Sequence, residues 1–369
     1  MTQLISTDVA VIGGGIVGAS AALALRRMNL AVTVIERDVC GSHSSGVNYG
    51  GVRRQGRSIS QLALSARAHE IWSRLESIIG IDGEYHRSGH LKIARSQADM
   101  ASLEIYREKT LAYGMDLQML DASDLRKLYP WLGDRAIGGS LCPEDGHANP
   151  RLVSPAFAAA ARRAGADIRE HSRVDSIEKD GQSFILTTQS GLQVRSAFVL
   201  NCAGAWSGKI AAQFGEVVPI EPIHPVMVVT EPLAPFMNLS LGVEGGGVYA
   251  RQAPSGNCVI GGSRGFALDD IRARPSRSAI NLVLQQTVEL LPSLRHAHII
   301  RSWSGTEGSL PDKQPVIGPS KTTSGLIHGF GFSGAGFQIG PAVGEVLAEL
   351  VRDGRTSTPI EAFAIDRYL

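Results

Sequence analysis

A glycine cluster over 13–18, with the sequence GGGIVG, constrains this chain more than any other feature. The apolar run 8–12 before it predicts a buried strand, and 16–28 after it carries Ala and Leu at helical density. The run 31–36 (AVTVIE) then predicts a second, β-branched strand. A strand, a glycine-rich turn, a helix and a second strand in this order predict the nucleotide-binding part of a Rossmann-like α/β domain.

The glycines have distinct tasks in such a turn. Gly13 allows the tight turn, Gly15 lets the backbone approach a pyrophosphate, and Gly18 permits close packing of the helix. Glu36 ends the second strand 18 residues after Gly18, near the offset of about 20 expected for an acid that binds a ribose hydroxyl. The motif therefore predicts a dinucleotide, NAD or FAD, and its spacing does not separate the two.

Charge and cysteine content exclude several other functions. The chain has 36 Lys and Arg against 35 Asp and Glu, mixed along its length, so no nucleic-acid partner is expected. The four cysteines form no CxxC pair, so neither a metal site nor an iron-sulfur cluster is predicted, and a reducing, cytoplasmic setting is favoured. The most apolar stretch, 9–25, is too short and too interrupted by glycine for a membrane span.

The rest of the pattern predicts one domain assembled from distant pieces. Helices are predicted over 59–79, 97–113, 154–164, 278–291 and 340–351, and strands over 166–174, 183–188, 193–200, 219–230, 247–251, 258–262 and 325–328. Segments near 1–40, 166–204 and 325–350 would then share one domain, and the strand-rich region between them would form an inserted lobe.

Three further stretches of small residues follow the first motif. They are the loop 41–54 (GSHSSGVNYGGVRR), 201–207 (NCAGAWS) after an apolar strand, and 329–338 (GFGFSGAGFQ) before the last helix. Together with 13–18, they resemble the D-amino-acid oxidase family of FAD enzymes, over nearly the whole chain. The resemblance implies an α/β fold with a Rossmann-like FAD-binding domain of 1–85, 142–214 and 302–369 and an inserted mixed-sheet substrate domain of 86–141 and 215–301.

The same resemblance assigns residues to the cofactor. They run from the ADP half to the flavin: Gly13, Gly15, Ile16, Gly18, Glu36, Arg37, His43, Ser44, Ser45, Gly50, Gly51, Val52, Val174, Ala203, Gly204, Trp206, Gly331, Gly334, Ala335, Gly336, Phe337 and Gln338. Amides of 334–338, at a helix start, would stabilise the negative charge that reduction leaves near the flavin N1 and C2 carbonyl. FAD is expected to be non-covalent, since the cysteine that holds flavin in some members is lacking here, and His43 is the one alternative tether.

The substrate site is less well marked. Glycine-oxidase-like members use an arginine to hold the substrate carboxylate, and the matching position here is read as Trp303. Candidates for the substrate pocket are Arg53, Arg54, Tyr249, Arg251, Arg264 and Trp303, although each arginine could instead be a solvated surface residue. No catalytic acid or base and no metal ligand is assigned, because hydride transfer from a neutral amine does not require a protein base.

Within the family, 45–57 and 146–150 (GHANP) resemble the β subunits of multisubunit amine dehydrogenases, most closely the B subunits of opine oxidases. Opines are secondary amines with at least two carboxylates. The implied reaction oxidises their C–N bond to an imine, which hydrolyses to an amino acid and a 2-keto acid. Electrons would pass to partners, a larger α-type subunit and an iron-sulfur subunit. Pro150 stands where one relative tethers FMN through histidine, so any FMN would lie non-covalently at a subunit interface.

Three alternatives stay open. The chain could be a stand-alone oxidase of the glycine, D-amino-acid or sarcosine type, which would form hydrogen peroxide unaided. It could also be a non-catalytic electron-transfer flavoprotein subunit. An NAD dehydrogenase would account for 13–18 but would leave 329–338 unexplained.

Overall fold

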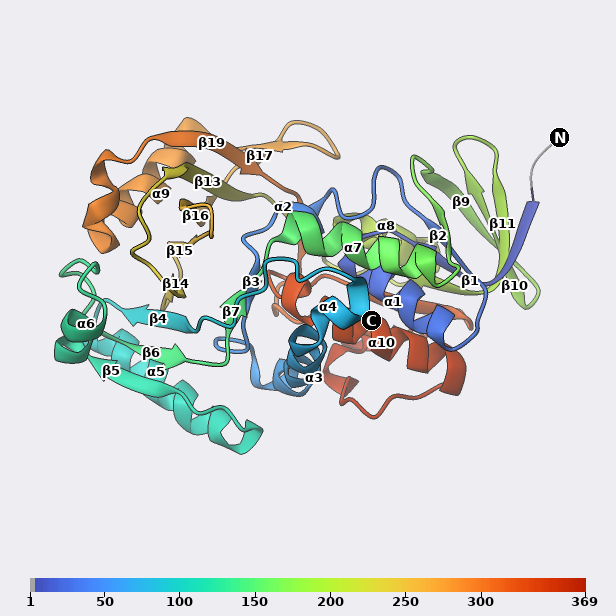
Figure 1. Cartoon of the computed structure of the whole chain (residues 1–369). Coiled ribbons are helices and arrows are strands. Elements are labelled where there is room, and N and C mark those ends of the chain that lie inside the picture. Colours follow the sequence, from blue (N-terminus) through green and yellow to red (C-terminus); the bar gives the residue numbers. More distant parts are fainter. Residues whose placement is uncertain (1–3) are drawn as a thin grey trace.

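An eight-stranded sheet forms one half of the protein in the computed structural model, which describes residues 4–369 (Figure 1). Its strands are β1 (Leu4–Ile12), β2 (Val32–Ile35), β8 (Asp167–Arg169), β9 (Val174–Asp180), β10 (Ser183–Thr188), β11 (Gln193–Asn201), β21 (Val316–Pro319) and β22 (Leu326–Phe330). The main path has the order β21-β22-β11-β1-β2-β8, and every neighbouring pair except β21 and β22 is parallel. β9 and β10 continue from β11 as an antiparallel meander.

Three helices pack on one face of this sheet: α1 (Ile16–Arg27), α7 (Pro150–Arg163) and α10 (Gly336–Asp353). Two more pack against these helices, α3 (Leu62–Ser73) on α10 and α4 (Leu75–Ile79) on α7. Side chains of β1 alternate between the two faces, as strand geometry requires. Val9 and Val11 join the core beneath the helices, whereas Ala10 and Ile12 join a second core with β9 and β10. Both faces are thus covered, which explains the apolar run over 8–12.

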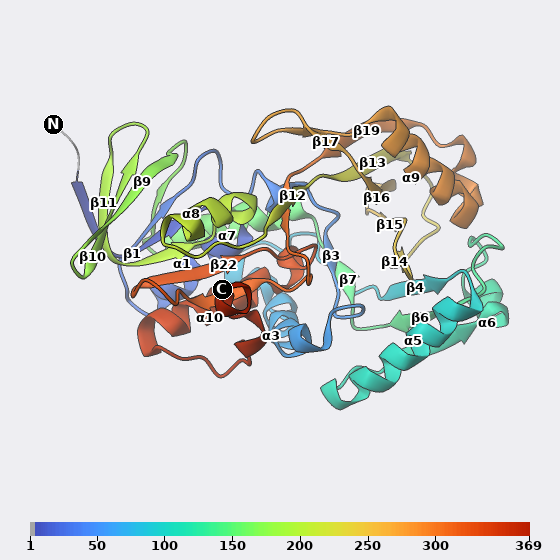
Figure 2. The same cartoon turned by 180° about the vertical axis from the view of Figure 1, so that it is seen from behind.

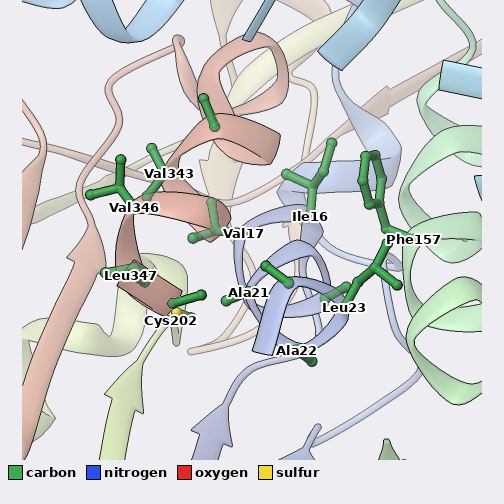
Figure 3. Packing of buried hydrophobic residues seen from close by; sticks show 14 of the residues in the cluster. Ile16, Val17, Ala21, Ala22, Leu23, Phe157, Cys202, Val343, Val346 and Leu347 are labelled. Atoms are coloured by element: carbon green, nitrogen blue, oxygen red, sulfur yellow. The ribbon is translucent and has the colours of Figure 1, made fainter. Parts of the chain in front are cut away.

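Close packing of α1 against α10 aligns the two helices that begin at the functional site. Figure 3 shows Val17 of α1 beside Val343 of α10. Gly344 makes this approach possible, because a Cβ there would collide with Ser20 and the backbone of α1. The Ser20 hydroxyl donates across the interface to the carbonyl of Gly340 at 3.1 Å.

A mixed sheet forms the other half, on the side remote from the N-terminus (Figures 1 and 2). Its strands are β4 (His90–Ala94), β5 (Gln118–Asp121), β6 (Gly138–Cys142), β13 (Pro225–Pro232), β14 (Ser240–Val243), β15 (Tyr249–Gln252), β16 (Asn257–Arg264) and β19 (Ile299–Ser304). The order is β19-β13-β16-β15-β14-β4-β6-β5, and only β14 and β4 are parallel. Its helices are α5 (Gln97–Thr110), α6 (Ala122–Leu128) and α9 (Arg277–Leu290).

The remaining elements are short. They are α2 (Ser44–Val47), α8 (Ser207–Gln213), β3 (Gly51–Val52), β7 (Gly146–His147), β12 (Glu221–Ile223), β17 (Phe266–Ala267), β18 (Ala273–Arg274), β20 (Glu307–Ser309) and the 3₁₀ turns η1 (Ile59–Gln61), η2 (Leu111–Tyr113), η3 (Gly204–Trp206), η4 (Pro292–His296), η5 (Glu361–Phe363) and η6 (Ile365–Tyr368). Two-stranded ribbons pair β3 with β7, β12 with β20 and β17 with β18. Among the helices within 4–369, none combines the length and hydropathy that a membrane span needs.

The predicted fold class, α/β with a Rossmann-like part and a mixed-sheet part, is confirmed. The single strand predicted over 166–174 is wrong, because the chain turns between β8 and β9 with His171 at φ 54°. The predicted helix over 59–79 breaks at Arg74, and the strand predicted over 219–230 divides between β12 and β13. Strands of the first sheet all fall within 1–85, 142–214 and 302–369, but the domain division itself stays a prediction.

Candidate active site

A cavity of about 750 Å³ lies between the two sheets. On one side it is lined by residues that follow the carboxyl ends of β1, β2 and β11, where ligands of open parallel sheets bind. On the other side it reaches β4, β14 and β15 of the mixed sheet. The site therefore has a dinucleotide end and a substrate end, built by different halves of the fold.

The glycine turn after β1 forms the dinucleotide end. Gly13 has φ 103°, and a Cβ there would collide with the carbonyl oxygen of Cys202. Gly15, the N-cap of α1, offers no side chain, and Gly15 and Ile16 line the cavity, so the positive end of the helix faces it. The Ile16 amide donates to Ser45 Oγ at 3.0 Å. The buried Glu36 carboxylate accepts hydrogen bonds from the amides of Gly14 at 2.6 Å and Asp38 at 2.8 Å. An acid held rigidly beside a helix start suits a ribose and its pyrophosphate.

Aromatic and charged side chains surround the adjoining part of the cavity. The Arg37 guanidinium lies 4.0 Å from the centre of the Trp206 ring, and His43 Nε2 lies 2.6 Å from Asp38 Oδ2. Burial raises the pKa of Asp38, but hydrogen bonds and charge from His43 and Arg37 outweigh it and lower that pKa. Glu36, Asp38 and His43 have ligand atoms within 4.8 Å of one another. We assign no metal to them, since Gly14 and Arg37 already occupy these groups.

The loop before α10 forms the opposite wall. Gly331 and Gly334 adopt φ 75° and 89°, and α10 begins at Gly336 without a side-chain cap. Gln338, fully buried in the first turn, exchanges hydrogen bonds of 2.8 and 3.0 Å with Ser65 of α3. The Trp72 indole donates to the backbone carbonyl of Gln338 at 2.8 Å. These contacts hold the helix start rigid while its first amides remain directed at the cavity.

The substrate end carries several charged groups. Arg57 is only 7% exposed and donates to the carbonyls of Arg53 and Gly334, each at 3.3 Å. Burial, together with the charge of Arg53, lowers the pKa of Arg57 to about 9, which leaves it cationic at neutral pH. Lys92 also lines this end but is paired with Glu244. Arg53 and Arg57, which both line the cavity, are thus the principal cations that this end can offer to an anionic ligand.

Most of the residues predicted to bind the cofactor line the cavity. Those on its wall are Gly13, Gly15, Ile16, Glu36, Arg37, His43, Ser44, Ser45, Gly51, Val174, Ala203, Gly204, Trp206, Gly331, Gly334, Gly336 and Phe337. Those away from it are Gly18, Gly50, Val52, Ala335 and Gln338. Gly18 and Gln338 act on the packing beneath the wall, since a Cβ on Gly18 would collide with the Gly13 carbonyl.

Of the six substrate candidates, Arg53 and Tyr249 line the cavity. Arg54, Arg251, Arg264 and Trp303 do not. The buried Arg251 donates through Nε to the carbonyl of Tyr49 at 2.9 Å, and the Trp303 indole donates to the carbonyl of Val47 at 2.7 Å. Both side chains are thus hydrogen-bonded to backbone carbonyls at the end of α2 and in the loop after it, which explains why they do not line the cavity.

Several charged or titratable wall residues were not selected from the sequence, among them Arg57, His90, Lys92 and Glu307 at the substrate end. His90 and Lys92 are two residues apart on β4, so their side chains point to the same face of the sheet. The neighbouring sequence does not indicate that this face lines the cavity. Arg57 lies four residues after Arg53 and is the only one with a sequence cue. Glu307 shares its segment with Trp303, and only the fold shows that the glutamate, not the tryptophan, reaches the cavity.

This arrangement defines a dinucleotide-dependent oxidoreductase with a separate substrate lobe. The profile of the family described as FAD dependent oxidoreductase (DAO) matches residues 8–350, and the chain belongs to that family. It is 26% identical to glycine oxidase of Geobacillus kaustophilus, over 98% of this chain and 97% of the relative, and 26% identical to the opine oxidase B subunit of Rhizobium meliloti over the same shares. The structure of L-proline dehydrogenase from P. horikoshii superimposes with a TM-score of 0.91 at 28% identity, covering 99% and 98% of the two chains. The protein is an FAD-dependent oxidoreductase that acts on CH–NH or CH–NH₂ donors.

The cavity fits FAD, because the starts of α1 and α10 line it and Gly13, Gly15, Gly334 and Gly336 form part of its wall without side chains. We expect purified protein to be yellow and acid precipitation to release the colour into the supernatant. The reason is that the segment 301–318, where some members of the family carry the cysteine that binds flavin covalently, contains no cysteine in this chain. An absorption spectrum of pellet and supernatant checks this expectation. A coloured pellet would instead point to a bond through His43, for which a His43→Ala variant would be the control.

Proposed function

We propose that this chain is the FAD-bearing catalytic subunit of an opine or related amine dehydrogenase. The observation that carries the proposal is the pair Arg53 and Arg57 on the wall of the substrate end. A single carboxylate needs one guanidinium fork, whereas two arginines suit a substrate with two carboxylates. Secondary amines of the octopine or nopaline type have that character. The 26% identity to the B subunit of an opine oxidase supports the same class.

The reaction follows from the cavity and its family. FAD, when bound, supplies the two-electron acceptor for oxidation of the C–N bond. The protein holds the substrate carboxylates through the arginines and shields the reacting carbon with Met227, Leu241 and Val248, which line the same end. The imine product is then cleaved by water into an amino acid and a 2-keto acid. These side chains therefore position the substrate and limit access of water to it.

Partners belong to the same proposal. Electrons would pass to a larger α-type subunit and to an iron-sulfur subunit, with FMN, if present, held non-covalently at a subunit interface. The similarity to a named subunit of an opine oxidase supports this assembly. We place the protein in the cytoplasm, an inference supported by its four cysteines, which are buried free thiols.

Anaerobic reduction of the bound flavin tests the substrate class. We expect octopine or nopaline to bleach the flavin absorption of the complex isolated with its neighbouring subunits, whereas equal concentrations of glycine or sarcosine, with one carboxylate, bleach it far more slowly. If no secondary amine with two carboxylates reduces the flavin in that complex, the proposed class is wrong.

Two alternatives give different results in the same assay. A stand-alone oxidase of the glycine, D-amino-acid or sarcosine type would turn over without partners and release hydrogen peroxide in air. A non-catalytic electron-transfer subunit would retain FAD but would not be reduced by any of these amines. Peroxide measurement on the isolated chain separates the first from our proposal, and the reduction assay separates the second.

A further inference from the structure

Glu307 is an acidic side chain on the wall of a cavity end that is otherwise cationic. It begins β20, which pairs with β12 between the two halves of the fold. Its Oε1 accepts the amide hydrogen of Gly334, in the loop before α10. Its Oε2 accepts no hydrogen bond and forms no ion pair among residues 4–369, and Glu307 lines the cavity. One carboxylate oxygen is thus anchored, and the other is available to a ligand.

The neighbouring cations donate to oxygen atoms other than those of Glu307. Arg57 donates to the carbonyls of Arg53 and Gly334, and the Lys313 ammonium donates to Ser309 Oγ at 3.0 Å. Burial raises the pKa of Glu307, whereas the Gly334 amide and the charges of Arg57 and Lys313 partly offset that rise. A partly exposed carboxylate with a raised pKa accepts a proton more readily than an ordinary one.

We propose that Glu307 binds the ammonium group of the substrate and takes its proton, while Arg53 and Arg57 hold the carboxylates. This inference rests on the proposed function, because it assumes an amine with carboxylates on both sides. Glu307 is then the group that converts the bound zwitterion into the neutral amine that oxidation requires.

The proton transfer is balanced without any further reactant. The N–H bond of the secondary ammonium breaks, its electron pair stays on nitrogen, and the proton forms an O–H bond at the free carboxylate oxygen of Glu307. No electrons change hands in this step. The products are a neutral amine and a neutral carboxylic acid, and a buried site penalises such neutral groups less than it penalises charges.

Other titratable wall residues are poorer acceptors. His90 is buried and its Nδ1 lies 2.8 Å from Gln55 Oε1, and burial holds the pKa of His90 well below its usual value. Burial raises the pKa of Tyr249, so its hydroxyl stays protonated. Lys92 is paired with Glu244. Glu307 is the carboxylate of this end, and its second oxygen accepts no hydrogen bond within the part of the chain that the structure describes.

Two probes of the same length isolate the interaction. Iminodiacetate and glutarate both carry two carboxylates, and they differ only in a central NH₂⁺ against CH₂. Binding is measured by anaerobic calorimetry on photoreduced holoprotein, in which neither probe can be oxidised. We expect about 10- to 100-fold tighter binding of iminodiacetate, as one charge-assisted hydrogen bond contributes. The preference should be present above the raised pKa of Glu307 and should fade as the pH falls through it, because a protonated carboxyl no longer attracts the ammonium.

Variants assign the preference to Glu307. Glu307→Gln keeps an acceptor for the Gly334 amide but loses the charge, so it should bind both probes about equally, and Glu307→Ala should do the same. Glu178→Gln, an exposed position on β9, serves as the control and should keep the wild-type preference. Equal binding by the wild type, or a preference that survives in both Glu307 variants, overturns this inference and leaves the dicarboxylate class intact. Binding of neither probe overturns the dicarboxylate class and the role of Glu307 together.

Discussion

Gly13→Ala is expected to strip most of the bound flavin from the protein. At φ 103° an alanine is strained by about 1–2 kcal/mol, and its Cβ also collides with the carbonyl oxygen of Cys202. The backbone of the turn must then move, which typically costs a further ~1–3 kcal/mol. Because this turn presents the start of α1 to the cofactor, FAD affinity should fall by roughly 10- to 100-fold. Flavin absorption per protein and titration of the apoprotein with FAD measure the effect.

Gly191→Ala is the matched control for this change. Gly191 also has a positive φ, 83°, but an added Cβ would meet no atom within 4 Å. The control therefore carries the same kind of backbone strain without the collision, in a surface turn between β10 and β11. We expect it to lose some stability and keep its flavin. Full flavin content in Gly13→Ala would contradict the assignment of this turn to the cofactor.

Arg57→Met should weaken binding of dicarboxylates by about 10- to 100-fold, because charge-assisted hydrogen bonds contribute about 1.5–3 kcal/mol each. Methionine retains much of the side-chain bulk in a position that is 7% exposed, so the loss is chiefly that of the guanidinium. Calorimetric titration with glutarate measures the effect directly. Flavin content should be recorded alongside, since Arg57 also donates to the Gly334 carbonyl in the loop before α10.

Two further variants serve as controls for Arg57→Met. Arg54→Met removes a neighbouring arginine that lies away from the cavity and donates to the carbonyl of Tyr113 at 2.8 Å, so glutarate affinity should hardly change. Arg57→Lys keeps the charge but loses the bidentate fork, and an intermediate affinity is expected. If Arg54→Met weakens binding as much as Arg57→Met does, the two-arginine arrangement proposed for the substrate end is wrong.

The cofactor half was readable in the sequence because its chemistry is local. A tight turn, a helix start and an acid at the end of the next strand all lie within 13–36, and each depends on neighbours a few residues away. The last glycine loop is equally local, and α10 begins within it at Gly336. Periodicity was less reliable where tertiary contacts intervene, as at the break between α3 and α4.

The substrate half depends on pairings that no short window contains. His90 and Lys92 come from β4, Tyr249 from β15 and Glu307 from β20, and the order of strands in the mixed sheet and the ribbon with β12 brings them to one cavity. By itself the sequence determined the α/β class, the dinucleotide turn and the family, since backbone geometry restricts those positions to glycine. Only the tertiary structure decided which arginines and which carboxylate line the cavity, because the local sequence around a charged side chain does not show whether it meets a cavity, a backbone carbonyl or water.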